Sequence, residues 1–309
     1  MRELGRTGVE VTELGFGAAP LGGLFAAVSP EQARDALAAA DKAGLRYVDT
    51  APHYGVGLSE QRVGEFLKDT PGWVLSTKVG RLLEEGDDPD LFVGAPRLRR
   101  RWDFSGDGVR RSLEDSLTRL PGIDIALVHD PDDFLDEALD EAFPALHRLK
   151  AEGVIRAVGA GMNHTAPLIR IVEEADPDCL LVAGRWNLLD RSAGDELLPL
   201  CAARGVSVLV GGVLGSGLLA DVRADAPYRY GATPSQELAL ARQLQEACAA
   251  HGVPLLAAAL RFPLRHPAVA SVLVGMRSAQ EVEAATAAWQ VEVPEALWAE
   301  LDALWESAQ

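Results

Sequence analysis

Four side chains that could together move a proton stand where predicted strands end. Asp49 and Tyr54 follow one short apolar run, Lys78 ends a second, and His129 follows a third. A phenol with a pKa of about 10 is a poor proton donor or acceptor at neutral pH. A neighbouring ammonium favours the phenolate and lowers that pKa, and a carboxylate holds the ammonium in place. These residue types therefore predict a proton-transfer site built around Tyr54.

Strand-like and helix-like segments alternate along the whole chain, and they must position these side chains. After a hairpin and a first strand within 2–17, strands are expected at 45–48, 73–77, 123–128, 154–159, 179–183, 206–210 and 270–274. Helices are expected at 30–43, 57–68, 106–119, 138–151, 165–174, 195–204, 235–250, 254–265, 278–289 and 294–306. This alternation predicts an α/β fold, a (β/α)8 TIM barrel with an N-terminal β-hairpin and an extra C-terminal helix.

A closed barrel is favoured over an open doubly wound sheet, because no Gly-x-Gly-x-x-Gly motif follows the first strand. The 309 residues suit one barrel, which typically needs about 250, and no change in composition marks a second domain. We therefore expect a single domain over residues 1–309. In such a barrel the carboxyl ends of the strands converge on one rim, where the four side chains should meet.

The charge and composition narrow the classes of partner. A net charge of −17 disfavours nucleic acid and anionic membranes, which need basic patches. The first residues lack an apolar signal region, and no apolar run approaches the ~20 residues of a membrane span, so a cytoplasmic protein is expected. The three cysteines are widely spaced, which predicts inert thiols and no metal site. We expect a small-molecule substrate and a monomer or small homo-oligomer.

Two long inserts interrupt the alternation after predicted barrel strands. The first covers 80–107 and contains Trp102 within an arginine-rich run; the second covers 213–233 and contains Tyr228-Arg229-Tyr230. Irregular loops of this length are uncommon unless they are disordered or functional. Both inserts follow barrel strands and should lie on the active-site rim, so they are expected to cover a substrate or cofactor.

The order of Asp49, Tyr54, Lys78 and His129 resembles the catalytic tetrad of the aldo-keto reductases. Further stretches that resemble this family in order and spacing are 2–8, 54–60, 187–191, 214–219 and 275–278. The resemblance implies an oxidoreductase that transfers hydride between NAD or NADP and a carbonyl or alcohol. It also implies that Tyr54 is the general acid and base, that Lys78 held by Asp49 tunes it, and that His129 orients the substrate oxygen.

Within the family, some stretches resemble the branch of D-threo-aldose (L-fucose) 1-dehydrogenases and pyridoxal 4-dehydrogenases. These are 102–112, 129–133, 159–163 and 211–213. The resemblance implies a small hydroxylated substrate such as a free aldose or pyridoxal. An aromatic face with carboxylates nearby suits a sugar ring, whose hydroxyls need acceptors. Trp102, His53 and Trp186 are therefore the candidate substrate-binding residues.

The cofactor residues are also taken from the resemblance. Asn163 is expected to bind the nicotinamide carboxamide, whereas Met162, Ala183 and Gly211 replace the serine, glutamine and stacking aromatic that are usual in the family. The other candidate cofactor residues are Leu214, Gly215, Ser216, Gly217, Gly275, Arg277 and Glu281. The glycine-rich turn suits a pyrophosphate. Arg277 suits an adenosine 2′-phosphate that Glu281 would repel, so NAD and NADP both stay open.

Three other functions fit parts of the sequence. A non-enzymatic nicotinamide-binding regulatory protein would share the barrel, and a general aldehyde reductase would share the tetrad but take another substrate class. A lyase or isomerase could use Lys78 as a Schiff-base lysine, because barrels host many chemistries. Asp49 argues against that role, since a salt-bridged ammonium is a weaker nucleophile.

Overall fold

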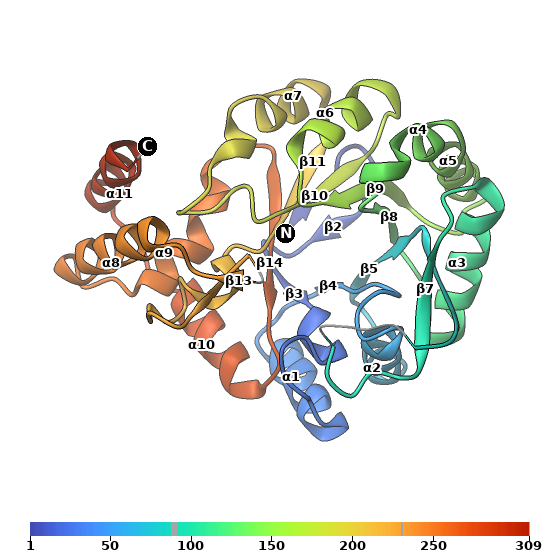
Figure 1. Cartoon of the computed structure of the whole chain (residues 1–309), viewed down its shortest axis with the longest axis horizontal. Coiled ribbons are helices and arrows are strands. Elements are labelled where there is room, and N and C mark those ends of the chain that lie inside the picture. Colours follow the sequence, from blue (N-terminus) through green and yellow to red (C-terminus); the bar gives the residue numbers. More distant parts are fainter. Residues whose placement is uncertain (88–91, 230, 309) are drawn as a thin grey trace.

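Eight parallel strands close into a barrel at the centre of the computed structural model, which describes residues 1–87, 92–229 and 231–308 (Figure 1). In order around the barrel, the strands are β3 (Leu14–Gly17), β4 (Tyr47–Asp49), β5 (Val74–Val79), β8 (Ile125–His129), β9 (Ala157–Met162), β10 (Cys179–Ala183), β11 (Ser207–Gly211) and β14 (Val269–Gly275). Strand β14 pairs back with β3 and closes the ring. The predicted (β/α)8 barrel is confirmed.

Alternation along each strand decides which side chains enter the barrel. In β8, Ala126 and Val128 belong to the large hydrophobic cluster shared with the helices, while Ile125 and Leu127 belong to the smaller inner cluster. Successive side chains of a strand point to opposite faces. His129 therefore continues the inward series and ends it with a polar group at the carboxyl end of the strand.

The N-terminal hairpin plugs the other end of the barrel. Strands β1 (Arg2–Glu3) and β2 (Glu10–Val11) pair antiparallel, as expected for the N-terminal hairpin. Its side chains Leu4, Val9 and Val11 are fully buried and join the inner cluster. The site can therefore open only at the carboxyl end of the strands.

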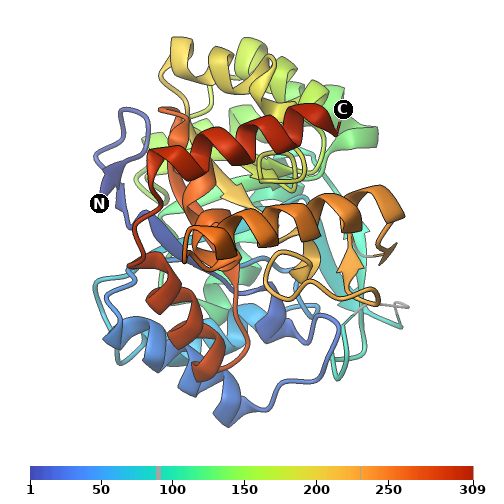
Figure 2. The ribbon, with the colours of Figure 1, turned by 90° about the vertical axis from the view of Figure 1, so that its left-hand side faces the viewer.

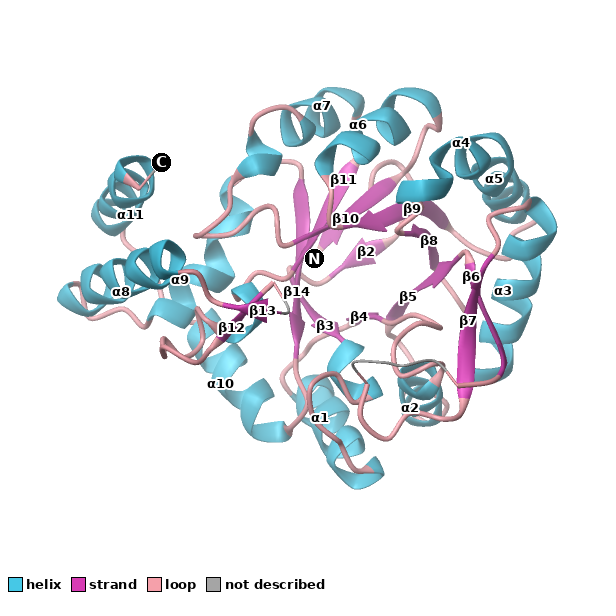
Figure 3. Cartoon of the chain, in the orientation of Figure 1, coloured by secondary structure: helices cyan, strands magenta, loops and turns pink. Residues whose placement is uncertain are grey.

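The helices form a ring outside the strands (Figures 1 and 3). They are α1 (Pro30–Lys42), α2 (Leu58–Leu67), α3 (Gly106–Arg119), α5 (Phe143–Ala151), α6 (Thr165–Glu174), α7 (Leu197–Arg204), α8 (Ser235–Ala250), α9 (Leu255–Arg261), α10 (Ala279–Trp289) and α11 (Glu295–Ser307). Helix α11 is the expected extra C-terminal helix, and it packs against α8 on the outside of the ring (Figure 2). Among the described residues no single helix is long and apolar enough to cross a membrane; α8 and 255–265 reach that size only together, across a 105° bend.

The segment expected as one helix over 138–151 is helical throughout, but its first part is the π-helix η3 (Ala138–Ala142), which continues into α5. The 3-10 turn η2 (Asp132–Phe134) and the short helix α4 (Leu135–Glu137) precede it. Pro144 explains the change of helix type, because it lacks an N–H and its ring clashes with the carbonyl four residues earlier. The strand expected at 154–159 lies instead at 157–162, because Gly153 and Val154 donate to carbonyls of α5 and end that helix.

Both inserts contain hairpins where irregular loops were expected. In the first, β6 (Arg81–Glu85) and β7 (Leu98–Trp102) pair antiparallel beside α3, outside the ring of barrel strands (Figure 3). Its arginine-rich sequence hides the strand pattern, because the exposed Arg99 and its neighbour Arg101 pair with Glu84 across the hairpin. In the second, β12 (Pro227–Tyr228) pairs with β13 (Gly231–Ala232). Residues 88–91 and Tyr230, which belong to these inserts, lie outside the described residues.

Candidate active site

The Lys78–Asp49 ion pair lies inside the barrel at the carboxyl ends of β4 and β5. Lys78 Nζ is 2.6 Å from Asp49 Oδ2 and also donates to the carbonyl of Thr50 at 2.9 Å. The other carboxylate oxygen accepts a hydrogen bond from Ser76 Oγ at 2.7 Å. Both charged side chains are almost fully buried. The ammonium is therefore held in one position by two acceptors, and the carboxylate by two donors.

Tyr54 stands over this pair on the turn that follows β4. Lys78 Nζ lies 4.5 Å from the centre of the Tyr54 ring. The turn is fixed by a close approach of two loops: Gly55 has φ +62°, and a Cβ there would lie 2.3 Å from the carbonyl oxygen of Gly22. A side chain at position 55 would push the loops apart and move the phenol. The tetrad geometry therefore depends on glycine at this position.

The charges at the site keep Lys78 protonated and His129 neutral. Burial alone would lower the pKa of the Lys78 ammonium, but the charge of Asp49, Tyr54 and hydrogen bonds to both raise that pKa overall. Burial holds the pKa of His129 well below its usual range, and the nearby cations Arg81 and Lys78 lower it further. The imidazole lies edge-on to the Tyr54 ring, with 5.9 Å between ring centres. It can therefore donate one N–H to a neutral or negative oxygen.

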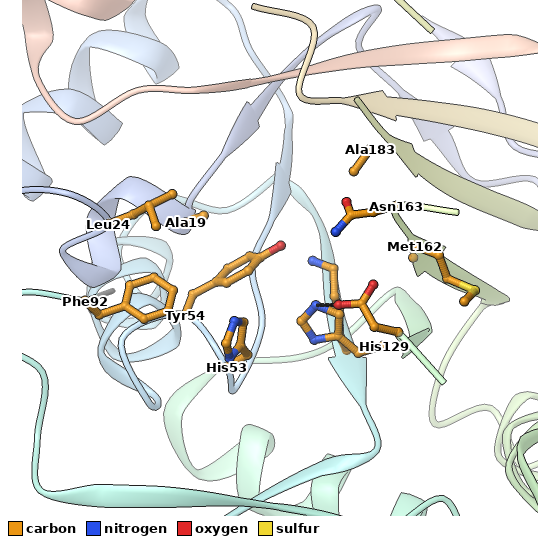
Figure 4. A pocket seen from close by; sticks show the side chains of 12 residues that line it. Ala19, Leu24, His53, Tyr54, Phe92, His129, Met162, Asn163 and Ala183 are labelled. Carbon is orange, nitrogen blue, oxygen red and sulfur yellow. Dashed lines mark ion pairs between the residues drawn. The ribbon is translucent and has the colours of Figure 1, made fainter. Parts of the chain in front are cut away.

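These residues face a cavity of about 210 Å³ at the mouth of the barrel (Figure 4). The residues that line it are Ala19, Leu24, His53, Tyr54, Lys78, Phe92, His129, Asp130, Gly161, Met162, Asn163 and Ala183. Three of the four predicted tetrad residues reach the cavity, and Asp49 lies behind Lys78. The cavity combines a few convergent polar groups with apolar walls, which is typical of a small-molecule site.

Phe92 and Leu24 form an apolar wall that the sequence did not reveal. They come from different loops and meet in an isolated antiparallel bridge. The Phe92 ring is nearly perpendicular to that of His53, with 5.3 Å between centres. Only the long-range contact between the loop after β3 and the first insert brings them together, so no local pattern could have identified them.

His53 lies in the cavity wall, as expected from its place beside Tyr54. Its ring centre is 5.5 Å from that of His129, and its Nδ1 accepts from Arg100 at 2.7 Å. Arg100 belongs to β7, so the first insert reaches the site through this contact. His164, which also seemed close to the rim, does not line the cavity; it pairs with Asp132 at 2.6 Å.

The two tryptophans proposed for substrate binding do not line the cavity. Trp186 packs on Phe262, and its indole N–H donates to the carbonyl of Pro263, so it supports the helix layer. Trp102 is 45% exposed on β7, with the Arg81 guanidinium 5.7 Å from its ring centre. It lies two residues from Arg100 on β7, so the two side chains are on the same face of the strand. Because neither tryptophan lines the cavity, their role in substrate binding stays a prediction.

Asp130 and Arg81 form a second ion pair against His129. Arg81 Nη2 is 2.6 Å from Asp130 Oδ2, and the same oxygen is 3.6 Å from His129 Nε2. Asp130 has φ +43°, a left-handed conformation that aspartate tolerates better than most residues. Burial raises the pKa of the Asp130 carboxyl, and the Arg81 charge opposes that rise. In the sequence, Asp130 directly follows the apolar strand β8, and Arg81 lies two residues after the end of β5.

The expected nicotinamide side of the cavity is formed by small or exposed residues. Asn163 is exposed at the end of β9, and its carbonyl accepts from Arg185 Nε at 2.6 Å. Met162, Gly161 and Ala183 continue this wall. Of the three positions where the family pattern is broken, Met162 and Ala183 thus line the cavity beside Asn163, and Gly211 does not.

The glycine-rich turn after β11 is folded onto itself. It forms the 3-10 turn η5 (Gly215–Gly217), with Ser216 at φ +59°. The N–H of Gly215 donates to Gly212, and that of Gly217 donates to Leu214. Two N–H groups that a pyrophosphate would need are therefore engaged within the turn. The role of 214–217 stays a prediction.

Arg277 and Glu281 meet beyond the end of β14, next to Gly275. Arg277 Nε is 3.0 Å from Glu281 Oε1, and the Arg277 backbone N–H donates to Glu281 Oε2 at 2.8 Å. Ser278 caps α10 by accepting from the Glu281 N–H. The carboxylate is therefore positioned by the start of the helix and neutralises the guanidinium.

Comparison with known proteins decides the family. The model of the aldo/keto reductase family matches residues 13–306. The chain belongs to the aldo/keto reductase family. It is therefore an NAD(P)-dependent oxidoreductase, and the family resemblance drawn from the sequence is confirmed.

This aldo-keto reductase is similar to enzymes with two different activities. It is 44% identical over 310 residues to a D-threo-aldose 1-dehydrogenase of Pseudomonas sp, covering 95% of this chain and 94% of the relative. It is 39% identical to a pyridoxal 4-dehydrogenase of Microbacterium luteolum, and the alignment covers 97% of this chain and 96% of the relative. The structure of the holo form of an aldo-keto reductase from Bacillus halodurans matches with a TM-score of 0.81 and 29% identity. The match covers 98% of this chain and 95% of that protein. Within the described residues, no group of three or more His, Cys, Asp or Glu side chains could hold a metal.

Proposed function

We propose that this enzyme oxidises or reduces a small hydroxylated substrate, a free aldose or a pyridoxal-like compound, with Tyr54 as the general acid and base. The observation that supports this most directly is the buried Lys78–Asp49 pair, whose Lys78 Nζ lies 4.5 Å from the centre of the Tyr54 ring. The ammonium stabilises the phenolate, so the phenol can exchange a proton near neutral pH. The bound nicotinamide supplies the hydride chemistry.

Each tetrad residue has a distinct task in this mechanism. For oxidation, the Tyr54 phenolate accepts the proton of the substrate hydroxyl; for reduction, the phenol donates a proton to the developing alkoxide. His129 is held neutral by its lowered pKa and donates an N–H to the same oxygen, which fixes its position. Asp49 keeps Lys78 charged and immobile. A Schiff-base role for Lys78 is disfavoured, because its raised pKa and two acceptors keep the amine protonated.

The nicotinamide fits the open wall beside the tetrad. Small side chains at Gly161 and Ala183 leave room for a flat ring, and the exposed amide of Asn163 can hold its carboxamide. At the far end of the cofactor, the Glu281 carboxylate stands against Arg277. A 2′-phosphate would meet this carboxylate, whereas a ribose hydroxyl could donate to it. We therefore propose that NAD(H) is preferred over NADP(H).

The substrate class is supported by the cavity and by the relatives. Polar groups from His53, His129 and Asp130 share the cavity with the apolar wall of Phe92 and Leu24. A sugar or pyridoxal offers hydroxyls to the first set and an apolar ring face to the second. Two relatives that align along nearly the whole chain are named for D-threo-aldose and pyridoxal.

A cofactor titration followed by a substrate screen tests the proposal. Quenching of tryptophan fluorescence by NADH and NADPH measures the two affinities, and tighter binding of NADH is expected. Turnover is then measured with L-fucose, related aldoses, pyridoxal and hydrophobic aldehydes. Nicotinamide binding without turnover of any carbonyl or alcohol would identify a non-enzymatic binding protein. Efficient turnover of hydrophobic aldehydes alone would leave a general aldehyde reductase.

A further inference from the structure

Asp130 is the charged side chain of the cavity whose place the tetrad does not explain. It directly follows His129, and its Oδ2 is 3.6 Å from His129 Nε2. A substrate whose reacting oxygen sits at His129 is therefore within reach of Asp130. The carboxylate is three-quarters buried, and a buried charge needs a partner or a function.

Arg81 partners only one side of this carboxylate. Arg81 Nη2 lies 2.6 Å from Asp130 Oδ2. The Arg81 side chain is buried and does not line the cavity. Among the described residues, Asp130 Oδ1 accepts no hydrogen bond, and the buried His129 Nδ1 and Arg81 Nε have no partner either. A side chain that lines the cavity thus offers it one unused acceptor.

The backbone also fixes Asp130 beside the cavity. Its left-handed φ is held by the N–H, which donates to the carbonyl of Gly161 at 3.1 Å on the neighbouring strand β9. With Arg81 fixed on one oxygen, the second oxygen cannot turn away from the cavity without breaking the ion pair. Asp130 is therefore preorganised for a ligand that brings a hydrogen-bond donor.

We propose that Asp130, held by Arg81, determines specificity by accepting a hydrogen bond from the substrate hydroxyl on the carbon next to the reacting carbon. This inference rests on the proposed function and applies to its aldose substrates, because pyridoxal carries no hydroxyl on the carbon next to its aldehyde. An anionic substrate is disfavoured, because the carboxylate would repel it and already neutralises Arg81. A site built around such an acceptor discriminates against the analogue that lacks the hydroxyl.

The test compares two aldehydes that differ by that hydroxyl alone, 2-hydroxypropanal and propanal. Both are assayed in reduction with the cofactor that the titration selects. Wild type is expected to prefer 2-hydroxypropanal in kcat/KM by roughly 10- to 100-fold, the scale of a hydrogen bond to a charged group. If neither aldehyde nor any other carbonyl is reduced, the proposed function fails and the inference fails with it.

Substitutions then separate recognition from catalysis. Asp130→Asn keeps the size and the left-handed backbone, but its hydrogen bonds are uncharged, so the preference should fall by roughly 10-fold. Asp130→Ala should reduce the preference to within about threefold. The matched control is Asp133→Asn, the same change at an exposed position three residues further on, and it should keep the wild-type ratio.

Thermal melting and cofactor titration of each variant establish that it is folded and binds the nicotinamide. If wild type reduces both aldehydes equally well, the function stands and the inference is wrong. A parallel loss of both activities in the Asp130 variants, with the ratio unchanged, would also overturn it and give Asp130 a supporting role for His129.

Discussion

The two sides of the active site are built differently. On the tetrad side, Asp49, Lys78 and His129 extend from β4, β5 and β8 and are almost fully buried. On the cofactor side, Asn163 is exposed, and the Arg277 and Glu281 side chains are 38% and 42% exposed. The first side is enclosed in the barrel, whereas the second is built from strand ends and loops that are more exposed. Substitutions should therefore affect chemistry on one side and affinity on the other.

The largest effect is expected from Tyr54→Phe. Loss of the hydroxyl should lower kcat by roughly 10² to 10⁴, the range of general acid–base catalysis, while the affinity for NADH stays near that of wild type. Steady-state turnover and fluorescence titration measure the two quantities. Near-normal turnover would rule out Tyr54 as the proton carrier and remove the distinction between the two sides.

Lys78→Met should displace the pH dependence of oxidation. Without the ammonium the phenolate is less favoured, so the rate should rise at a pH higher by roughly 1 unit or more. A pH–rate profile of kcat/KM measures this. Removing one partner of a buried pair costs about 3–5 kcal/mol, so circular dichroism must establish that the variant is folded. An unchanged profile would mean that Lys78 does not set the pKa of the titrating group.

Much of the tetrad side could be predicted from the sequence, because its geometry follows from local rules. Apolar strands with period two, each ended by a polar residue, place Asp49, Lys78 and His129 inside one rim. Tyr47, which begins strand β4, shows that residue type alone does not identify the catalytic tyrosine. Tyr47 is fully buried, its hydroxyl lies 3.0 Å from Ser76 Oγ, and burial raises its pKa well above the usual value. Tyr47 lies at the start of β4, whereas Tyr54 lies on the turn that follows the strand, and this position distinguishes the two tyrosines.

The rest of the site depends on contacts between distant segments, which no local pattern encodes. Phe92 reaches the cavity by pairing with Leu24, and the hairpin of β6 and β7 was hidden by its arginines. Trp186 was expected to bind the substrate, yet it packs on Phe262. A large aromatic near a strand end has more apolar surface to bury in the helix layer than at an open rim.

On the cofactor side, Glu281 should decide between NAD(H) and NADP(H). Glu281→Arg removes the repulsion and adds a cation, so NADPH should bind more tightly by roughly 1.5–3 kcal/mol, the scale of a charged hydrogen bond. Arg277→Ala should weaken NADPH and leave NADH unchanged. Titrations with both cofactors measure each effect, and turnover at saturating cofactor should change little. Equal effects of Arg277→Ala on both cofactors would show that this arginine does not recognise the phosphate.

The lowered pKa of His129 predicts a loss of stability in acid. The unfolded imidazole titrates near pH 6.5 and the folded one well below it, so between these values the unfolded state binds more protons. Stability should therefore fall as the pH drops below about 6.5, by up to ~1.4 kcal/mol per pH unit. The difference in melting temperature between pH 7.5 and 5.5 should be smaller in His129→Gln. If both proteins lose the same stability, His129 is not buried as a neutral group.

The smallest effect on the tetrad side is expected from Trp102→Ala. Trp102 is 45% exposed and outside the cavity wall, and its ring is only half covered in its cation–π contact with Arg81, which is worth about 0.5–1 kcal/mol. KM for an aldose should therefore change by less than about threefold. Phe92→Ala is the matched comparison, because Phe92 comes from the same insert but lines the cavity, and its KM should rise more. If Trp102→Ala raises KM as much as Phe92→Ala, the hairpin must close over the bound sugar, and the tetrad side would then include a surface that the buried residues do not provide.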